Sequence, residues 1–281
     1  MKKVEFVLTS KHNQKRFLGD ATWKNHVDKK PVILLIHGFK GFKDWGCFNM
    51  IAEHYAELGY AVVKSNTAFD GTTLDMPFEI TDFDAFAENN FSKELDDIGT
   101  TIDWIFDSQC PIPNLDLDKV FLIGHSRGGG MALLKAAEDS RIKKVATWAS
   151  IPSVDKFFSE DFLIEWKIKG IAHVVNGRNG DNLPLHYQIV EDFNQNKDRL
   201  DVGKAIASLA IPTLLIHGDV DETVPVAAAQ YLNEIKPDSD VLIIEGGSHT
   251  FGSKHPWEAT SLPVHMQQVV DATEKFFIHH H

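Results

Sequence analysis

The sequence has only two cysteines, Cys47 and Cys110, and neither lies in a C-x-x-C or C-x-x-H pattern. A disulfide framework and a thiolate zinc site are therefore not expected. Basic charge is also scarce, because 28 Lys and Arg residues stand against 40 Asp and Glu residues and leave a net charge of −12. This balance disfavours a nucleic acid or an anionic membrane surface as the partner.

Long hydrophobic runs are missing as well. No segment approaches the ~20 apolar residues of a membrane span, and the N-terminal stretch lacks the apolar core of a signal peptide. The sequence therefore predicts a soluble, cytoplasmic protein. It also lacks H-E-x-x-H, G-x-G-x-x-G and G-x-x-x-x-G-K-[ST], so we expect no metal, no dinucleotide and no other cofactor.

The chain has 281 residues, of which 43% are apolar, and this is enough for a full hydrophobic core. We predict a single domain over 1–278 and interpret the three histidines at 279–281 as the remnant of a purification tag. Two alternating runs and six buried-type apolar runs predict eight strands, at 3–9, 16–23, 31–38, 61–66, 119–126, 143–150, 212–219 and 240–247.

Helical spacing of apolar residues separates these runs, at 45–58, 93–107, 127–139, 226–236 and 259–277. The alternation predicts an α/β fold, a mostly parallel sheet of about eight strands with helices on both faces. Two intervals are too long to be simple connections. We interpret 153–209 as a small helical cap insertion and 67–92 as a functional or mobile loop.

The stretch GHSRG places Ser126 between Gly124 and Gly128, at the end of a predicted strand and the start of a predicted helix. This is the context of the G-x-S-x-G nucleophile elbow, in which small residues leave room for a strained turn. The helix N-terminus would also favour the negative charge that forms during attack by the serine. The alternative is a Gly-rich turn with an incidental serine.

A reactive serine needs a base within hydrogen-bond reach and a carboxylate that orients the base. The strand at 212–219 ends in a stretch that contains Asp219, Asp221 and Glu222, and the next strand is followed by His249. Because parallel strands end at one edge of a sheet, these side chains are expected to gather beside Ser126.

The stretches LLIHGFKG, GHSRGGG, IHGDVDETVP and GGSHTF, in this order, resemble the α/β-hydrolase superfamily. The likeness is to its serine-esterase branch, and to dienelactone-hydrolase-like and acylaminopeptidase-like members. It implies Ser126, Asp221 and His249 as the catalytic triad, with Asp219 as the competing acid. Position 126 is Ser, so the Asp chemistry of dehalogenases and the Cys chemistry of dienelactone hydrolases do not carry over.

The same resemblance implies an oxyanion hole formed by the backbone N–H groups of Phe39 and Arg127. His37 is interpreted as a residue that holds its loop rather than as a second base. Phe69, Trp166 and Phe251 are candidates for an apolar substrate pocket, although packing onto the core explains them equally well.

Together these features predict a serine hydrolase that cleaves a small-molecule carboxylic ester through an acyl-enzyme. A feruloyl-esterase-like specificity is one form of this prediction. The alternatives are a peptidase or acyltransferase on the same triad, or a ligand-binding protein in which the triad is inactive.

Overall fold

The computed structural model describes residues 1–25, 29–155 and 159–279. Of the predicted tag remnant, only His279 is described, and it is the last residue of the C-terminal helix. The other two histidines, and residues 156–158 within the predicted cap, lie outside the described part. None of the described helices is long and apolar enough to cross a membrane.

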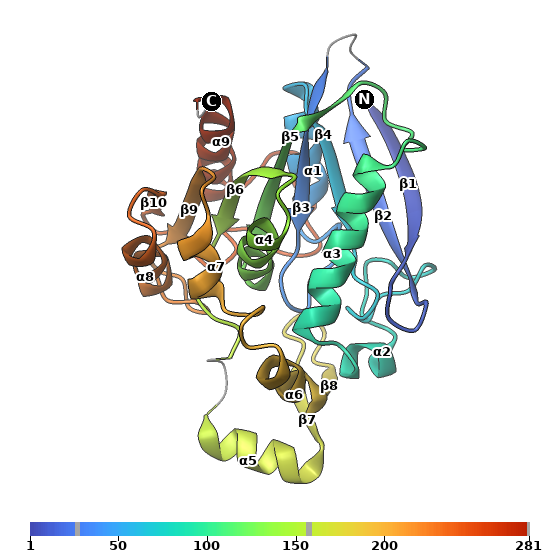
Figure 1. Cartoon of the computed structure of the whole chain (residues 1–281), viewed down its shortest axis with the longest axis vertical. Helices are drawn as coiled ribbons and strands as arrows, with labels where there is room; N and C mark the ends of the chain where they lie inside the picture. The colour runs from blue at the N-terminus through green and yellow to red at the C-terminus, as the bar shows by residue number, and fades with distance from the viewer. Residues whose placement is uncertain (26–28, 156–158, 280–281) are drawn as a thin grey trace.

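An eight-stranded sheet forms the centre of the fold (Figure 1). Its strands, in spatial order, are β1 (Lys2–Thr9), β2 (Arg16–Trp23), β4 (Ala61–Ser65), β3 (Lys30–Ile36), β5 (Leu115–His125), β6 (Ile142–Trp148), β9 (Thr213–Gly218) and β10 (Asp240–Ile244). All eight predicted strands are present. The two alternating runs form β1 and β2, which pair antiparallel, and the sheet is parallel from β4 to β10.

Helices cover both faces of the sheet because the central strands are apolar on both sides. Along β3, Leu34 faces one core cluster and its neighbours Ile33 and Leu35 face the other. The second cluster is covered by α1 (Phe48–Glu57) and α9 (Val264–His279). The first is covered by α3 (Phe91–Phe106), α4 (Arg127–Glu138), α7 (Val202–Ser208) and α8 (Ala227–Ile235).

The long interval between β6 and β9 holds α5 (Glu160–Lys169), β7 (Ile171–Val175), β8 (Asn182–His186), α6 (Gln188–Gln195) and α7. The segment from α5 to α6 lies at one end of the molecule, below the sheet in Figure 1. In contrast, α7 packs against α4 in the layer that covers the sheet. The segment that stands apart is therefore shorter than the predicted 153–209.

The insertion also contains a strand pair where only helices were expected, since β7 and β8 pair antiparallel. The helix that follows this strand pair, α6, begins at Gln188. Leu183 and Leu185 are buried while Pro184 and His186, which alternate with them, are partly exposed, and this is the two-residue period of a strand. The predicted loop at 67–92 contains one short helix, α2 (Phe83–Ala87).

A buried ionic cluster connects the loop after β3 to the edge of the sheet. The carboxylate of Asp20 on β2 lies 2.5 Å from Nζ of Lys43 and 3.0 Å from Nζ of Lys64 on β4. Asp44 completes the cluster at 2.7 Å from the Lys64 ammonium. The side chains of Asp20, Lys43 and Lys64 are at most 1% exposed. The cluster therefore holds the loop that follows His37 in place.

Replacing Asp20 with alanine leaves two buried ammonium groups with less compensating charge. We expect Asp20→Ala to lower the free energy of unfolding by roughly 3–5 kcal/mol, because the removal of one partner leaves buried charge without compensation. Urea denaturation measures this difference. Asp198→Ala, which removes an exposed partner of Lys204, is the control and should leave the midpoint unchanged. Equal midpoints for the two variants would contradict the role of the cluster.

Candidate active site

Ser126 occupies a strained turn between β5 and α4, with φ 57° and ψ −121°. A Cβ atom on Gly124 would lie 2.2 Å from the carbonyl oxygen of Gly128. A Cβ atom on Gly128 would lie 2.4 Å from the carbonyl oxygen of His37. Real Cβ atoms do not approach backbone so closely, so both positions need glycine. The turn therefore presents Ser126 at the carboxyl end of the central strand.

The structure brings Ser126, His249 and Asp221 together from three different strand ends. Oγ of Ser126 lies 2.9 Å from Nε2 of His249, and Nδ1 of His249 lies 2.8 Å from Oδ2 of Asp221. Asp221 follows β9, and His249 follows β10. The serine hydroxyl, the imidazole and the carboxylate thus form one continuous chain of hydrogen bonds.

Asp221 is held as a carboxylate by the groups around it. Its side chain is 0% exposed, and Oδ1 accepts hydrogen bonds of 2.8 Å from the backbone N–H groups of Thr223 and Val224. Burial opposes ionisation, but hydrogen bonds from His217, His249 and the Val224 N–H outweigh it and hold the pKa of Asp221 well below its usual range. Asp221 therefore stays ionised at neutral pH.

Asp219, the competing acid, has a different partner. Its Oδ1 accepts a 2.7 Å hydrogen bond from the backbone N–H of Gly246, in the loop that leads to His249. The structure therefore places Asp219 in a contact between two loops and places Asp221 beside the imidazole.

Two further histidines, which no sequence motif marks as functional, support the chain of hydrogen bonds. Nε2 of His125 lies 2.9 Å from the carbonyl oxygen of His249. Burial, assisted by the nearby His249, lowers the pKa of His125 to about 3, so its ring is neutral and donates to that carbonyl. Nε2 of His217 lies 3.2 Å from Oδ2 of Asp221. Both residues lie within predicted strands and no motif assigns them a function, so only their contacts in the structure indicate a role.

The loop that contains Phe39 lies directly against the serine. A Cβ atom on Gly38 would be 3.0 Å from Cβ of Ser126, so the backbone before Phe39 packs against the serine, and Arg127 follows the serine directly. The Arg127 guanidinium lies 3.8 Å from the centre of the Phe39 ring and 3.1 Å from Oε1 of Glu94. The side chain of Arg127 is therefore engaged in an ion pair.

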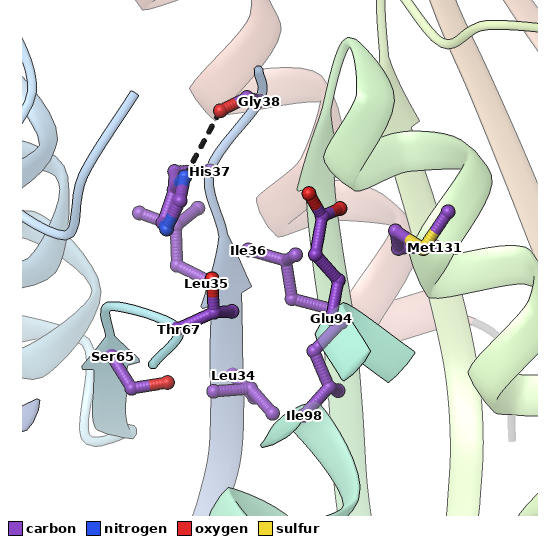
Figure 2. Close-up of a pocket in the computed structure, with 10 residues that line it drawn as sticks. All are labelled: Leu34, Leu35, Ile36, His37, Gly38, Ser65, Thr67, Glu94, Ile98 and Met131. Atoms are coloured by element: carbon purple, nitrogen blue, oxygen red, sulfur yellow. Dashed lines mark hydrogen bonds between the residues drawn. The ribbon is translucent and has the colours of Figure 1, made fainter. Parts of the chain in front are cut away.

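His37 holds the same loop by a hydrogen bond to Gly38, which Figure 2 marks with a dashed line. Its Nδ1 lies 3.0 Å from the carbonyl oxygen of Gly38, and its Nε2 lies 3.5 Å from the Asp70 carboxylate. Burial disfavours the charged ring, but Asp70 outweighs this effect and raises the pKa of His37. The cavity in Figure 2 has a volume of only about 20 Å³, which is too small for a substrate.

A large cavity of about 610 Å³ opens from Ser126 and His249 toward the insertion. This volume lies in the usual range for small-molecule sites. Its wall is mainly apolar and includes Phe39, Phe91, Ile151, Val154, Leu163, Val174, Leu185, Ile189, Val190, Phe193 and Val224. The spacing of Ile189 and Phe193, one turn apart on α6, is the sequence signal that could have identified this wall.

A smaller cavity of about 180 Å³ adjoins the other side of Ser126. It lies between the loop that contains Phe39 and the turn that joins β7 to β8, with Trp45 and Phe48 on its wall. The candidate site therefore has two compartments, and the Ser126 hydroxyl lies on the wall of both.

The three aromatic residues predicted to bind substrate lie elsewhere. Phe69, Trp166 and Phe251 are at most 3% exposed, and none belongs to the wall of either cavity within the described ranges. Phe69 and Phe251 pack in core clusters, and the Trp166 ring donates a 2.9 Å hydrogen bond to the carbonyl oxygen of Leu185. The prediction that these residues bind substrate is therefore wrong. Their large rings are buried in the core, where their burial stabilises the fold.

Comparison with known proteins identifies relatives of the fold. The BD-FAE family model matches residues 21–235, and no curated protein matches the sequence. Among solved structures, Est1E from Butyrivibrio proteoclasticus is 19% identical, with a TM-score of 0.67 and 97% of each chain covered. The esterase domain of a Rhodothermus marinus protein is 17% identical, with a TM-score of 0.60, and the alignment covers 90% of this chain and 91% of that domain.

The acylaminoacyl peptidase of Pyrococcus horikoshii is 18% identical, with a TM-score of 0.68. The alignment covers 98% of this chain but only 41% of the peptidase. At these identities the likeness concerns the fold, and the predicted α/β-hydrolase fold is confirmed.

The close approach of backbones at the turn makes Gly128 irreplaceable. We expect Gly128→Ala to lower the free energy of unfolding by at least about 3 kcal/mol, because the new Cβ atom would clash with backbone atoms in the core that cannot easily move. Thermal or urea unfolding measures the loss. Gly177→Ala is the matched control, since a Cβ atom there meets nothing within 4 Å. If both alanine variants are equally stable, the turn is not constrained as described.

Proposed function

The chain belongs to the BD-FAE family of the α/β-hydrolase superfamily, and on this premise we propose that it is a serine hydrolase that cleaves carboxylic esters through an acyl-enzyme. The observation that carries the proposal is the chain of hydrogen bonds from Ser126 through His249 to Asp221, with distances of 2.9 and 2.8 Å. The first distance allows the proton of the serine to pass to the base, and the second allows the carboxylate to orient the base.

The first half of the reaction is an attack by Ser126 on the ester carbonyl. Nε2 of His249 accepts the proton of the hydroxyl as Oγ bonds to the carbonyl carbon, and the carbonyl oxygen becomes an oxyanion. His249 then donates that proton to the leaving alcohol, and the acyl group remains on Ser126. In the second half, His249 activates a water molecule that releases the acid and restores the hydroxyl.

Asp221 orients the base and stabilises its charged form. An ionised carboxylate at Nδ1 keeps the proton on that nitrogen, so Nε2 faces the serine with a free lone pair. The depressed pKa of Asp221 supports this role, because the carboxylate does not take up the proton itself. His125 and His217 act as positioning residues, since they contact His249 and Asp221 rather than the substrate.

The oxyanion is proposed to bind the backbone N–H groups of Phe39 and Arg127. Phe39 belongs to a loop that packs against Ser126, and Arg127 begins a helix whose N-terminus favours negative charge. The ring of Phe39 packs on the Arg127 guanidinium and connects these two segments, while the ion pair with Glu94 ties Arg127 to α3.

The mainly apolar wall of the large cavity is suited to bind an apolar or aromatic group on one side of the ester bond. Est1E, which has a similar fold, has been solved with ferulic acid bound. Hydroxycinnamoyl esters are therefore included among the proposed substrates.

Ser126→Ala removes the proposed nucleophile. We expect it to lower kcat for p-nitrophenyl acetate by a factor on the order of 10⁶, because loss of one triad member removes nearly the whole contribution of the triad. Circular dichroism checks that the variant is folded. Ser140→Ala, an exposed serine after α4, is the control and should retain full activity. Full activity in the folded Ser126→Ala variant would overturn the proposal.

A fluorophosphonate probe separates this proposal from a ligand-binding protein with an inactive triad. We expect the probe to label the wild-type chain at Ser126 and not the Ser126→Ala variant. A folded wild-type sample that remains unlabelled would favour the binding protein. Addition of an alcohol tests the acyltransferase alternative, which predicts that acyl transfer exceeds hydrolysis.

The two acids after β9 should differ sharply in their effect. We expect Asp221→Asn to lower kcat by a factor of roughly 10³–10⁴, because an amide at Nδ1 favours the wrong imidazole tautomer. Asp219→Asn should change kcat by less than about tenfold, since an amide oxygen can still accept from the Gly246 N–H. Steady-state kinetics on the same ester measures both. The reverse order would assign the acid to Asp219.

A further inference from the structure

The smaller cavity beside Ser126 has an unusual charge. Its wall carries two cationic side chains, Lys40 and Arg178, and none of the residues that line it has a carboxylate. The chain as a whole has a net charge of −12, with 40 Asp and Glu residues against 28 Lys and Arg residues. A positively charged compartment at the reacting serine therefore stands out against the rest of the protein.

The two cations are held in place by neutral groups. Nζ of Lys40 donates a 3.0 Å hydrogen bond to the carbonyl oxygen of Val175, at the end of β7. Arg178 lies in the turn that joins β7 to β8, and its Nη1 donates a 2.7 Å hydrogen bond to the backbone carbonyl oxygen of Lys40. In the part of the chain that the structure describes, no carboxylate lies within 4.0 Å of either cation. The site is therefore ordered without being neutralised.

The electrostatics of Lys40 reflect this lack of a partner. Burial lowers the pKa of its amino group, and repulsion from Arg178 and Arg127 lowers it further. Burial also lowers the pKa of Arg178, and the carboxylate that opposes this, Glu79, is not on the cavity wall. An anion bound between the two cations would remove this repulsion.

The larger cavity adds to the imbalance. Its wall carries Lys40, Arg127 and Lys197 but only one acid, Asp155. Arg127 is already paired with Glu94, so Lys40, Arg178 and Lys197 are the cations that face the two compartments without an ion-pair partner in the described ranges. The small compartment carries Lys40 and Arg178 and has no acid on its wall, so an anion gains most there.

We propose that the preferred substrate is an ester that carries a carboxylate, which binds Lys40 and Arg178 in the small compartment while an apolar group occupies the large one. This inference rests on the ester hydrolysis proposed above. The planar Arg178 guanidinium matches the two oxygens of a carboxylate, and Lys40 supplies a second charge. The volume of about 180 Å³ limits the anionic part to a small group.

Four synthetic esters in two matched pairs test the proposal and locate the charge. The acyl pair is the 4-nitrophenyl half-ester of adipic acid and its neutral primary amide. The alcohol pair is the hexanoate ester of 3-hydroxybenzoate and that of 3-hydroxybenzamide. In one pair, we expect kcat/KM to be at least about tenfold higher for the anionic member, because it gains charge-assisted hydrogen bonds. The pair that responds identifies the side that carries the carboxylate.

Removal of either cation should abolish this preference. We expect Arg178→Gln and Lys40→Gln each to lower the ratio of anionic to neutral kcat/KM by about tenfold. The ratio isolates the charge, since any displacement of the loop slows both members of a pair. Arg16→Gln, which removes an exposed cation on β2, is the matched control and should leave the ratio unchanged.

The outcomes separate this inference from the proposed function. Wild-type protein that cleaves the neutral esters as fast as the anionic ones overturns the inference and leaves ester hydrolysis standing. A preference that survives in both Gln variants also overturns it, because the charge is then read elsewhere. If none of the four esters is cleaved and Ser126 is not labelled by the fluorophosphonate probe, the proposed function itself fails.

Discussion

The absence of room around the turn at Ser126 is the constraint on which the site depends. Gly124, Gly128 and the carbonyl oxygen of His37 approach so closely that a single Cβ atom would push them apart. This contact sets the end of β5, the start of α4 and the position of the loop after β3 at the same time. The loop after β3, which is distant in the sequence, therefore meets the junction of β5 and α4 at one serine, and the packing around the turn offsets its strain.

The parallel sheet supplies the other members of the site. Since β5, β9 and β10 run in the same direction, the residues that follow them emerge at one edge. The backbone N–H groups of Thr223 and Val224 neutralise the cost of burying the Asp221 carboxylate. Buried charge recurs at Asp20, Lys43 and Lys64, where it fixes the loop that borders the serine. The rigid sheet and these buried polar groups thus hold the hydrogen bonds between the side chains at working distances.

The spacing of apolar residues predicted the strands and helices of the central sheet and its covering layers. The eight strands and the five main helices were visible because their apolar residues repeat with the periods of strands and helices. The strand pair β7 and β8 was not predicted, since Leu183 and Leu185 also fit the start of a helix. Their pairing with β7 depends on contacts that a local pattern does not show. The aromatic residues Phe69, Trp166 and Phe251 failed as pocket residues for a related reason. An apolar side chain looks the same in the sequence whether it lines a cavity or fills the core.

The sequence by itself determined the fold class, the elbow around Ser126 and the order of the acid and the base, because each depends on residue types at fixed spacing. The charge and the size of the two compartments were decided only by the tertiary structure. Lys40 and Arg178 are separated by more than a hundred residues, and nothing in either local stretch predicts that both line one cavity. Their proximity arises because the insertion between β6 and β9 folds back over the carboxyl end of the sheet. Chemistry is encoded locally in this protein, whereas the surroundings of the reacting group exist only once distant segments pack together.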